Sequence, residues 1–265
     1  MSALVVIIAT FALMFALWEA PLTADIAEDQ VVVDTMIRQY RVVVPHKRMR
    51  PTPVVFAFHG IGDSTASMAD YSQLDRVAAQ NGFILVYPAA LRSMWSTKNV
   101  NFSDLDSNPD VRFFDQLLDH LASMHQIDRE RIYVMGMSNG ATFAQLLVTA
   151  RSNQIAAVVA HSGPRLKGLA ECDPTLPIML IVGENDSACS PMNADADQYR
   201  RNGNTVEYVS VPRLAHAWSA RHNNQMWRFL FRHVRHKEDM AEPSDARQAL
   251  DRPFLTCVES TPRAR

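Results

Sequence analysis

The sequence predicts an α/β protein in which a mostly parallel sheet is covered by helices on both faces. Short apolar runs alternate along the chain with amphipathic stretches of helical length, and the runs contain almost no polar residues. Continuous apolar runs are typical of strands that are buried on both faces of a parallel sheet. The expected strands cover residues 31–44 (one or two strands), 54–58, 83–88, 131–135, 155–160, 177–182 and 205–211.

The expected helices lie between these strands. The clearest one covers residues 111–126, where Val111, Phe114 and Leu118 recur at the spacing of one helix face. The others cover residues 71–80, 141–148, 193–202 and 223–234. A chain of 265 residues with 48% hydrophobic composition suits a single domain of this class, which we expect over residues 31–235.

The two ends of the chain differ from this pattern. Residues 3–18 carry no charge, a stretch that is short for a membrane span and typical of a signal peptide. We therefore expect residues 1–27 to be an export signal, with an uncleaved membrane anchor as the alternative, and the protein to be secreted or in the cell envelope. An acidic stretch without apolar pattern, residues 19–30, precedes the first expected strand, and the charged, proline-broken residues 236–265 predict a poorly ordered tail.

Composition and motifs exclude several functions. The net charge of −2 gives no basic field that would attract nucleic acid. The sequence contains no phosphate-binding glycine loop, zinc-ligand pair or EF-hand, so we expect neither a metal nor a cofactor. The three cysteines, Cys172, Cys189 and Cys257, are too few for a disulfide scaffold. Two possibilities are equally open: Cys172 and Cys189 form a disulfide bridge, or they are two buried thiols.

The segment from Gly136 to Gly140 reads Gly-Met-Ser-Asn-Gly and lies between an expected strand and an expected helix. G-x-S-x-G in this context is the nucleophile elbow of the α/β-hydrolase fold, with Ser138 as the nucleophile. A serine on so sharp a turn has a strained backbone, and side chains two residues to either side would collide with neighbouring elements. The helix that follows directs its free amides at a developing oxyanion.

A serine hydroxyl needs a base at neutral pH, and a histidine base needs a carboxylate to orient it. In α/β-hydrolases these residues follow in the order serine, acid, histidine, at the ends of strands. Asp186 follows the expected strand 177–182 and His216 follows strand 205–211, which makes them the predicted acid and base. The rivals weighed against them are Glu184, Asp195, Asp197 and His161, the last of which precedes the acid.

The strand at residues 54–58 ends in His59-Gly60-Ile61, where α/β-hydrolases supply an oxyanion donor. We expect the amides of Ile61 and Asn139 to form the oxyanion hole, with Gly62 as the next choice, and His59 to brace the loop. Two tryptophans are the expected substrate-binding residues: Trp95 and Trp218, which lies beside His216. The alternative for Trp95 is that it pins its polar loop to the core.

Residues 110–114 and 127–140 resemble the feruloyl esterase and polyhydroxybutyrate depolymerase family of secreted α/β-hydrolases, which also includes acetylxylan-type esterases. The resemblance extends over about residues 40–234. It implies hydrolysis of phenolic, acetyl or short polyester carboxylic esters by an acyl-enzyme route. Leu214-Ala215 precede His216 where the family often has glycines, and Ser219 stands where a proline is common, so the substrate stays open.

The sequence thus predicts a serine esterase that acts on a small-molecule or polymer ester. One alternative is a serine peptidase of the prolyl-oligopeptidase type, because the same three residues can cleave amides. The other is a catalytically inactive hydrolase fold that serves as a binding module.

Overall fold

The structure is a computed structural model that describes residues 22–235. The predicted export signal and tail lie outside the described residues, with one exception at the start. Residues 24–27 of the expected leader belong to strand β1 (Ala24–Val33), so the expectation of an unpatterned segment up to residue 30 is wrong. Within residues 22–235, no helix is long and apolar enough to cross a membrane.

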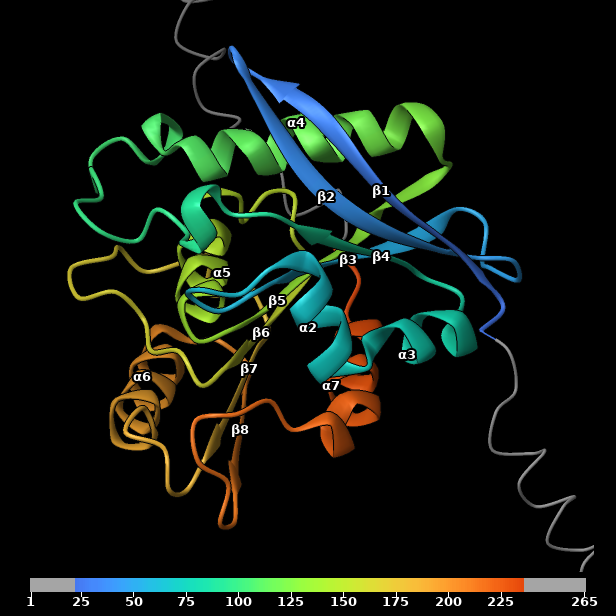
Figure 1. Cartoon of the computed structure of the whole chain (residues 1–265). Coiled ribbons are helices and arrows are strands. Elements are labelled where there is room, and N and C mark those ends of the chain that lie inside the picture. Colours follow the sequence, from blue (N-terminus) through green and yellow to red (C-terminus); the bar gives the residue numbers. More distant parts are fainter. Residues whose placement is uncertain (1–21, 236–265) are drawn as a thin grey trace, which may run out of the picture. The chain divides into compact units, whose positions relative to one another are not determined.

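The strands form one eight-stranded sheet in the order β1-β2-β4-β3-β5-β6-β7-β8 (Figure 1). The β1–β2 and β2–β4 pairs are antiparallel, and every other neighbouring pair is parallel. After β1 the strands are β2 (Met36–Pro45), β3 (Thr52–Phe58), β4 (Ile84–Pro88), β5 (Ile127–Met137), β6 (Ala157–His161), β7 (Ile178–Gly183) and β8 (Val206–Val211).

The helices occur where the sequence predicts them, with one addition. They are α2 (Thr65–Ser72), α3 (Leu74–Asn81), α4 (Pro109–Met124), α5 (Asn139–Ala150), α6 (Cys189–Asn202) and α7 (Asn223–Phe231), with short 3₁₀ turns η1 (Leu91–Ser93), η2 (Leu105–Ser107) and η3 (Ala220–His222). Helix α2 is the one not expected. Ser64 caps it, and the left-handed backbone of Gln73 separates it from α3.

Alternate residues of the central strands pack into two separate cores. In β3, Val54, Phe56 and Phe58 face the core that α4, α5 and α6 cover. Val55 and Ala57 face the opposite core, which α2, α3 and α7 cover. Figure 1 shows α3 and α7 on one side of the sheet and α4 and α5 on the other. This arrangement confirms the predicted parallel sheet with helices on both faces.

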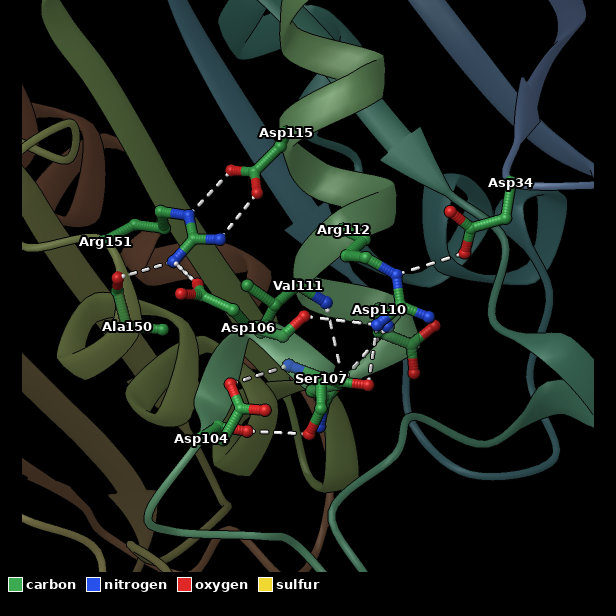
Figure 2. A network of polar contacts seen from close by, with 11 residues as sticks. Asp34, Asp104, Asp106, Ser107, Asp110, Val111, Arg112, Asp115, Ala150 and Arg151 are labelled. Atoms are coloured by element: carbon green, nitrogen blue, oxygen red, sulfur yellow. Dashed lines mark hydrogen bonds and ion pairs between the residues drawn. The ribbon is translucent and has the colours of Figure 1, made fainter.

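The far end of α5 is fixed by an arginine network (Figure 2). Arg151, just after α5, donates from two guanidinium nitrogens to the Asp115 carboxylate on α4, at 2.8 and 2.6 Å. The same guanidinium lies 2.7 Å from the carboxylate of Asp106. Arg112 on α4 donates to the backbone carbonyl of Asp106 at 3.1 Å. These bonds tie the helix that follows Ser138 to α4 and to the loop before it.

Cys172 and Cys189 are both free thiols, so the expected alternative of a bridge between them is wrong and the alternative of thiols holds. Cys172 is buried, and burial raises the pKa of its thiol to about 11. A thiol with so high a pKa stays protonated and unreactive at neutral pH. Cys257 lies outside the described residues.

Candidate active site

Ser138 lies on the turn between β5 and α5 with an unusual backbone conformation. Its φ is +54° and its ψ is −118°, outside the regions that residues with side chains normally occupy. Such conformations cost on the order of 1–3 kcal/mol and are typical of functional sites. A Cβ atom on Gly136 would stand 2.3 Å from the backbone carbon of Gly140, so the turn tolerates no side chain there. The physical reason given for the two glycines is therefore confirmed.

The structure brings the three predicted side chains into one chain of hydrogen bonds. Nε2 of His216 lies 2.9 Å from Oγ of Ser138, and its Nδ1 lies 2.9 Å from Oδ2 of Asp186. Because a carboxylate only accepts, Nδ1 carries the proton and Nε2 is free to accept the one from Ser138. The other oxygen of Asp186 accepts the amide N–H of Ala188 at 2.9 Å, which fixes the orientation of the carboxylate.

The environment of Asp186 favours its charged form. Burial raises the pKa of this carboxyl, but hydrogen bonds from the Ala188 amide, the Ser162 hydroxyl and His216 outweigh burial and lower the pKa below its ordinary value. The side chain of Asp186 is fully buried, whereas about half of the His216 side chain (49%) is exposed. The acid is thus protected from water while the imidazole faces the space where a substrate would bind.

The rival carboxylates have other roles in the structure. Glu184 is exposed. Asp195 accepts the amide N–H of Arg165 at 2.8 Å, and Asp197 pairs with Arg200 at 2.9 Å on the surface of α6. None of them bonds to His216.

The loop after β3 lies beside Ser138. The amides of Ile61 and Asn139 donate to no acceptor among residues 22–235, so both are free to bind an oxyanion. The amide of Gly62, the next choice from the sequence, donates instead to the carbonyl of Ser93 at 2.8 Å. These bonds favour the Ile61–Asn139 pair over any pair that includes Gly62.

His59 braces this loop, as its sequence position indicates. Its ring is buried, and Nδ1 lies 2.7 Å from the carbonyl of Gly60. Nε2 accepts the amide N–H of Ala90 at 3.1 Å, so the proton is on Nδ1. Burial lowers the pKa of His59, which keeps the ring neutral. Both nitrogens are used within the fold, and neither is available to a substrate.

A cavity of about 440 Å³ opens directly above the Ser138 hydroxyl. Its wall is mixed: Ile61, Met137 and Trp218 supply apolar surface, and Asp63 and Tyr71 supply polar groups. The Tyr71 hydroxyl lies 3.4 Å from the Asp63 carboxylate, and no ion pair among the described residues involves Asp63. Such a wall can contact a ligand that has both apolar and polar parts.

The model of the family described as Esterase PHB depolymerase matches residues 39–173, which is more than half of the chain. The chain belongs to this family. The matched region includes β3, the loop with Ile61, the nucleophile turn and α5.

Curated relatives of this chain include acetylxylan and feruloyl esterases. A bifunctional acetylxylan esterase/xylanase of Neocallimastix patriciarum is 26% identical over 149 residues, which are 56% of this chain and 21% of the relative. Feruloyl esterase B of Thermothelomyces thermophilus is 28% identical over 131 residues, 49% of this chain and 45% of the relative. The chain thus spans about half or less of the length of the curated relatives it matches.

This chain is also similar in structure to solved hydrolases. The feruloyl esterase module from Clostridium thermocellum, solved as an S954A mutant with sinapinate, superposes with a TM-score of 0.65. The match is 12% identical and covers 82% of this chain and 91% of the module. At this identity the similarity shows the fold alone, and it confirms the predicted α/β-hydrolase fold.

The two candidate tryptophans of this family member differ in position. Trp95 is fully buried, stacks on Phe143 at 4.9 Å and donates from its indole to the carbonyl of His59 at 2.9 Å. It does not line the cavity, so its prediction as a substrate-binding residue is wrong. Its amide donates to the Asn139 side chain at 2.8 Å, which fits the alternative that it pins its loop. Trp218 does line the cavity.

The sequence analysis missed Asp63, Tyr71 and Met137, which line the cavity of this depolymerase-family chain. Met137 stands next to the nucleophile, which is a signal that the motif itself contains. Asp63 directly follows the Gly60 turn, yet a polar residue there is equally typical of a turn or helix cap. No sequence signal places Tyr71 at the cavity, because α2 has little amphipathic pattern.

Proposed function

We propose that this chain is a serine carboxylic-ester hydrolase that works through Ser138, His216 and Asp186. One observation carries the proposal: two 2.9 Å contacts link Ser138 to His216 and His216 to Asp186 at the floor of an open cavity. Membership of the depolymerase family supports the same activity. The exposed imidazole and buried acid support the assignment of the proton-accepting role to His216.

In the proposed first half-reaction, the Ser138 hydroxyl attacks the ester carbonyl carbon while Nε2 of His216 accepts its proton. The buried carboxylate of Asp186 stabilises the imidazolium that forms. The negative oxygen of the tetrahedral intermediate accepts hydrogen bonds from the amide of Ile61 in the loop after β3 and from the amide of Asn139 at the start of α5. The carbon–oxygen bond to the alcohol then breaks, and His216 gives its proton to the leaving alcohol.

The second half-reaction regenerates the enzyme. Water enters the cavity and gives a proton to His216 as its oxygen attacks the acyl carbon on Ser138. The bond to the Ser138 oxygen breaks, the proton returns to that oxygen, and the free acid leaves. Every proton transfer in the two half-reactions goes through the imidazole of His216, so the proposed reaction needs no metal or cofactor.

The proposed substrates are phenolic, acetyl or short polyester esters. The names of the curated relatives, which include feruloyl and acetylxylan esterases, support this range. The mixed wall of the cavity, apolar at Trp218 and polar at Asp63 and Tyr71, supports an acyl or alcohol group with both characters. Rates on matched feruloyl, acetyl-xylose and hydroxybutyrate esters would identify the preferred class.

We also propose that the protein acts outside the cytoplasm, secreted or in the cell envelope. The uncharged run at residues 3–18 supports this location. Mass spectrometry of the protein from its native cells measures whether residues ahead of β1 are removed, and an intact N-terminus in the soluble cytoplasmic fraction would contradict the proposal.

The activity is tested with Ser138→Ala. The variant is expected to lose nearly all turnover of p-nitrophenyl acetate, by roughly a thousandfold or more, because no nucleophile remains. Ser123→Ala, at an exposed serine on α4, is the matched control and should keep the wild-type rate. Circular dichroism verifies that both fold. Equal rates in Ser138→Ala and the control, or no adduct on Ser138 after a fluorophosphonate probe, would overturn the proposal.

A further inference from the structure

His161 lies at the end of β6, beneath the candidate site, and is completely buried. Sequence order excluded it as the base. Its backbone nevertheless contacts the nucleophile, because the carbonyl of His161 accepts the amide N–H of Ser138 at 2.8 Å. This bond joins β6 to the nucleophile turn just after strand pairing ends.

The ring of His161 makes two further polar contacts, which define its tautomer. Nε2 accepts the amide N–H of Ser219 at 3.0 Å, and a backbone amide can only donate. The proton is therefore on Nδ1, which donates to the hydroxyl oxygen of Ser162 at 3.0 Å. Burial lowers the pKa of His161 to about 3 against the attraction of Asp186, so the ring is neutral.

The face of the His161 ring supports the wall of the cavity. It stacks on the indole of Trp218 with ring centres 4.9 Å apart and planes 22° from parallel. The indole nitrogen of Trp218 donates to the side-chain oxygen of Asn223 at 2.9 Å. Trp218 and Ser219 follow His216 closely, so His161 contacts the segment that carries the candidate base through both its ring face and its Nε2.

The third link runs through Ser162 to the acid. Ser162 is buried and has a left-handed backbone, with φ at +56°. Its oxygen accepts from Nδ1 of His161, so its own hydrogen is left to donate to Asp186. The Ser162 hydroxyl is one of the groups that lower the pKa of Asp186.

We propose that His161 is a positioning residue that aligns the nucleophile, the acid and the base through Ser138, Ser162 and the Trp218–Ser219 segment. The inference rests on the proposed function of the same site. His161 touches no substrate; it acts on the acid by orienting the Ser162 hydroxyl and on the cavity by fixing Trp218. The two actions use different atoms of one ring and can therefore be separated.

Three variants separate them. His161→Gln places an oxygen near Nε2 for the Ser219 amide but removes both the donor to Ser162 and the ring that stacks on Trp218. His161→Asn keeps a donor near Nδ1 but removes the stack on Trp218 and the bond to Ser219. Ser162→Ala removes only the hydroxyl. Thr52→Val is the matched control, because Thr52 is a buried hydroxyl at the start of β3, at the opposite end of the parallel strands.

Steady-state rates on p-nitrophenyl acetate, corrected for the fraction of folded protein by circular dichroism, should show different effects on kcat and on KM in the variants. Ser162→Ala is expected to lower kcat about tenfold with KM unchanged, because Asp186 loses an oriented donor, and His161→Gln to lower kcat by as much and also to raise KM, because it loses the stack on Trp218 as well. His161→Asn is expected to raise KM severalfold with a smaller change in kcat. Thr52→Val should change neither. A merely structural histidine would give the same loss in both of its variants.

Proton NMR gives a readout that does not depend on turnover. The proton between Nδ1 of His216 and Asp186 resonates far downfield, and its shift should change in Ser162→Ala and His161→Gln but not in Thr52→Val. If that resonance and the kcat and KM of all three variants match the control, the proposal is wrong. If wild-type protein hydrolyses no ester, the proposed function fails, while the NMR comparison still tests the role of His161.

Discussion

The Cα atom of Gly140 lies so close to strand β3 that a Cβ atom on it would stand 2.2 Å from the carbonyl oxygen of Phe58. Phe58 ends β3 and leads into the loop with Ile61, and Gly140 follows Asn139 in α5. The two candidate oxyanion amides therefore belong to elements whose backbones are in direct contact. The distance between the Ile61 and Asn139 amides therefore depends on Gly140 having no side chain.

Gly140→Ala should consequently disturb the site and the fold together. We expect a loss of several kcal/mol in the free energy of unfolding, as for other overpacked interiors, and a large loss of esterase activity. Gly203→Ala is the control: that glycine ends α6 with φ at +100°, and its nearest contact would be 3.5 Å away. It should cost only about 1 kcal/mol and leave kcat intact. Equal costs in urea titrations would contradict the close approach.

Trp218 and Trp95 should respond differently to substitution. Trp218→Ala removes a cavity wall and is expected to raise KM for an aromatic ester about tenfold or more, because buried aromatic surface is lost. Trp95→Phe removes a buried indole bond and is expected to lower the melting temperature while KM stays within about twofold. If instead Trp95→Phe raised KM and Trp218→Ala lowered only the melting temperature, Trp95 would be the residue that contacts the substrate.

The carboxylate of Asp63 should give the cavity a preference for positive over negative substrates. It lines the cavity and takes part in no ion pair among the described residues. At a partly exposed site a unit charge a few ångströms away is worth ~1 kcal/mol, or about fivefold in rate. We expect kcat/KM to favour an ester with an ammonium group over its carboxylate analogue.

Asp63→Asn should abolish that preference while rates on a neutral ester of the same length change little. Because asparagine keeps the shape of the side chain, the comparison isolates charge. A ratio that is the same in wild type and variant would mean that Asp63 does not sense the substrate.

Stability should fall as the solution is acidified. His161 has a pKa of about 3 in the folded protein against an ordinary value of 6.5, so the unfolded chain binds more protons between these values. Its contribution is fully present above pH 6.5 and is lost progressively towards pH 3, on the order of a few kcal/mol. The burial-lowered pKa values of His59 and His222 act in the same direction.

Urea titrations from pH 7 to pH 4 measure this slope in wild type and in His161→Gln. The variant should be less stable at pH 7 and should lose less stability on acidification, because glutamine does not titrate. Parallel curves would show that His161 is not the source of the slope.

The amino-acid sequence was enough to predict the fold class and the three side chains that the structure brings together in the candidate site. The apolar runs in β5 and β7 indicated buried strands, and Ser138, Asp186 and His216 follow the ends of β5, β7 and β8 in that order. The prediction of the fold succeeds because strand burial and strand ends are local properties that periodicity reveals.

Which side chains meet across neighbouring strands could not be predicted and is seen in the folded structure alone. The sequence shows Trp95 and Trp218 alike as aromatic residues in loops. In the structure, Trp95 packs against Phe143 and Trp218 lines the cavity. His161 looked like a rejected base, yet it lies under the site because β6 is parallel and adjacent to β5. Such contacts depend on strand order and register, which join residues distant in sequence and leave no periodic signal along the chain.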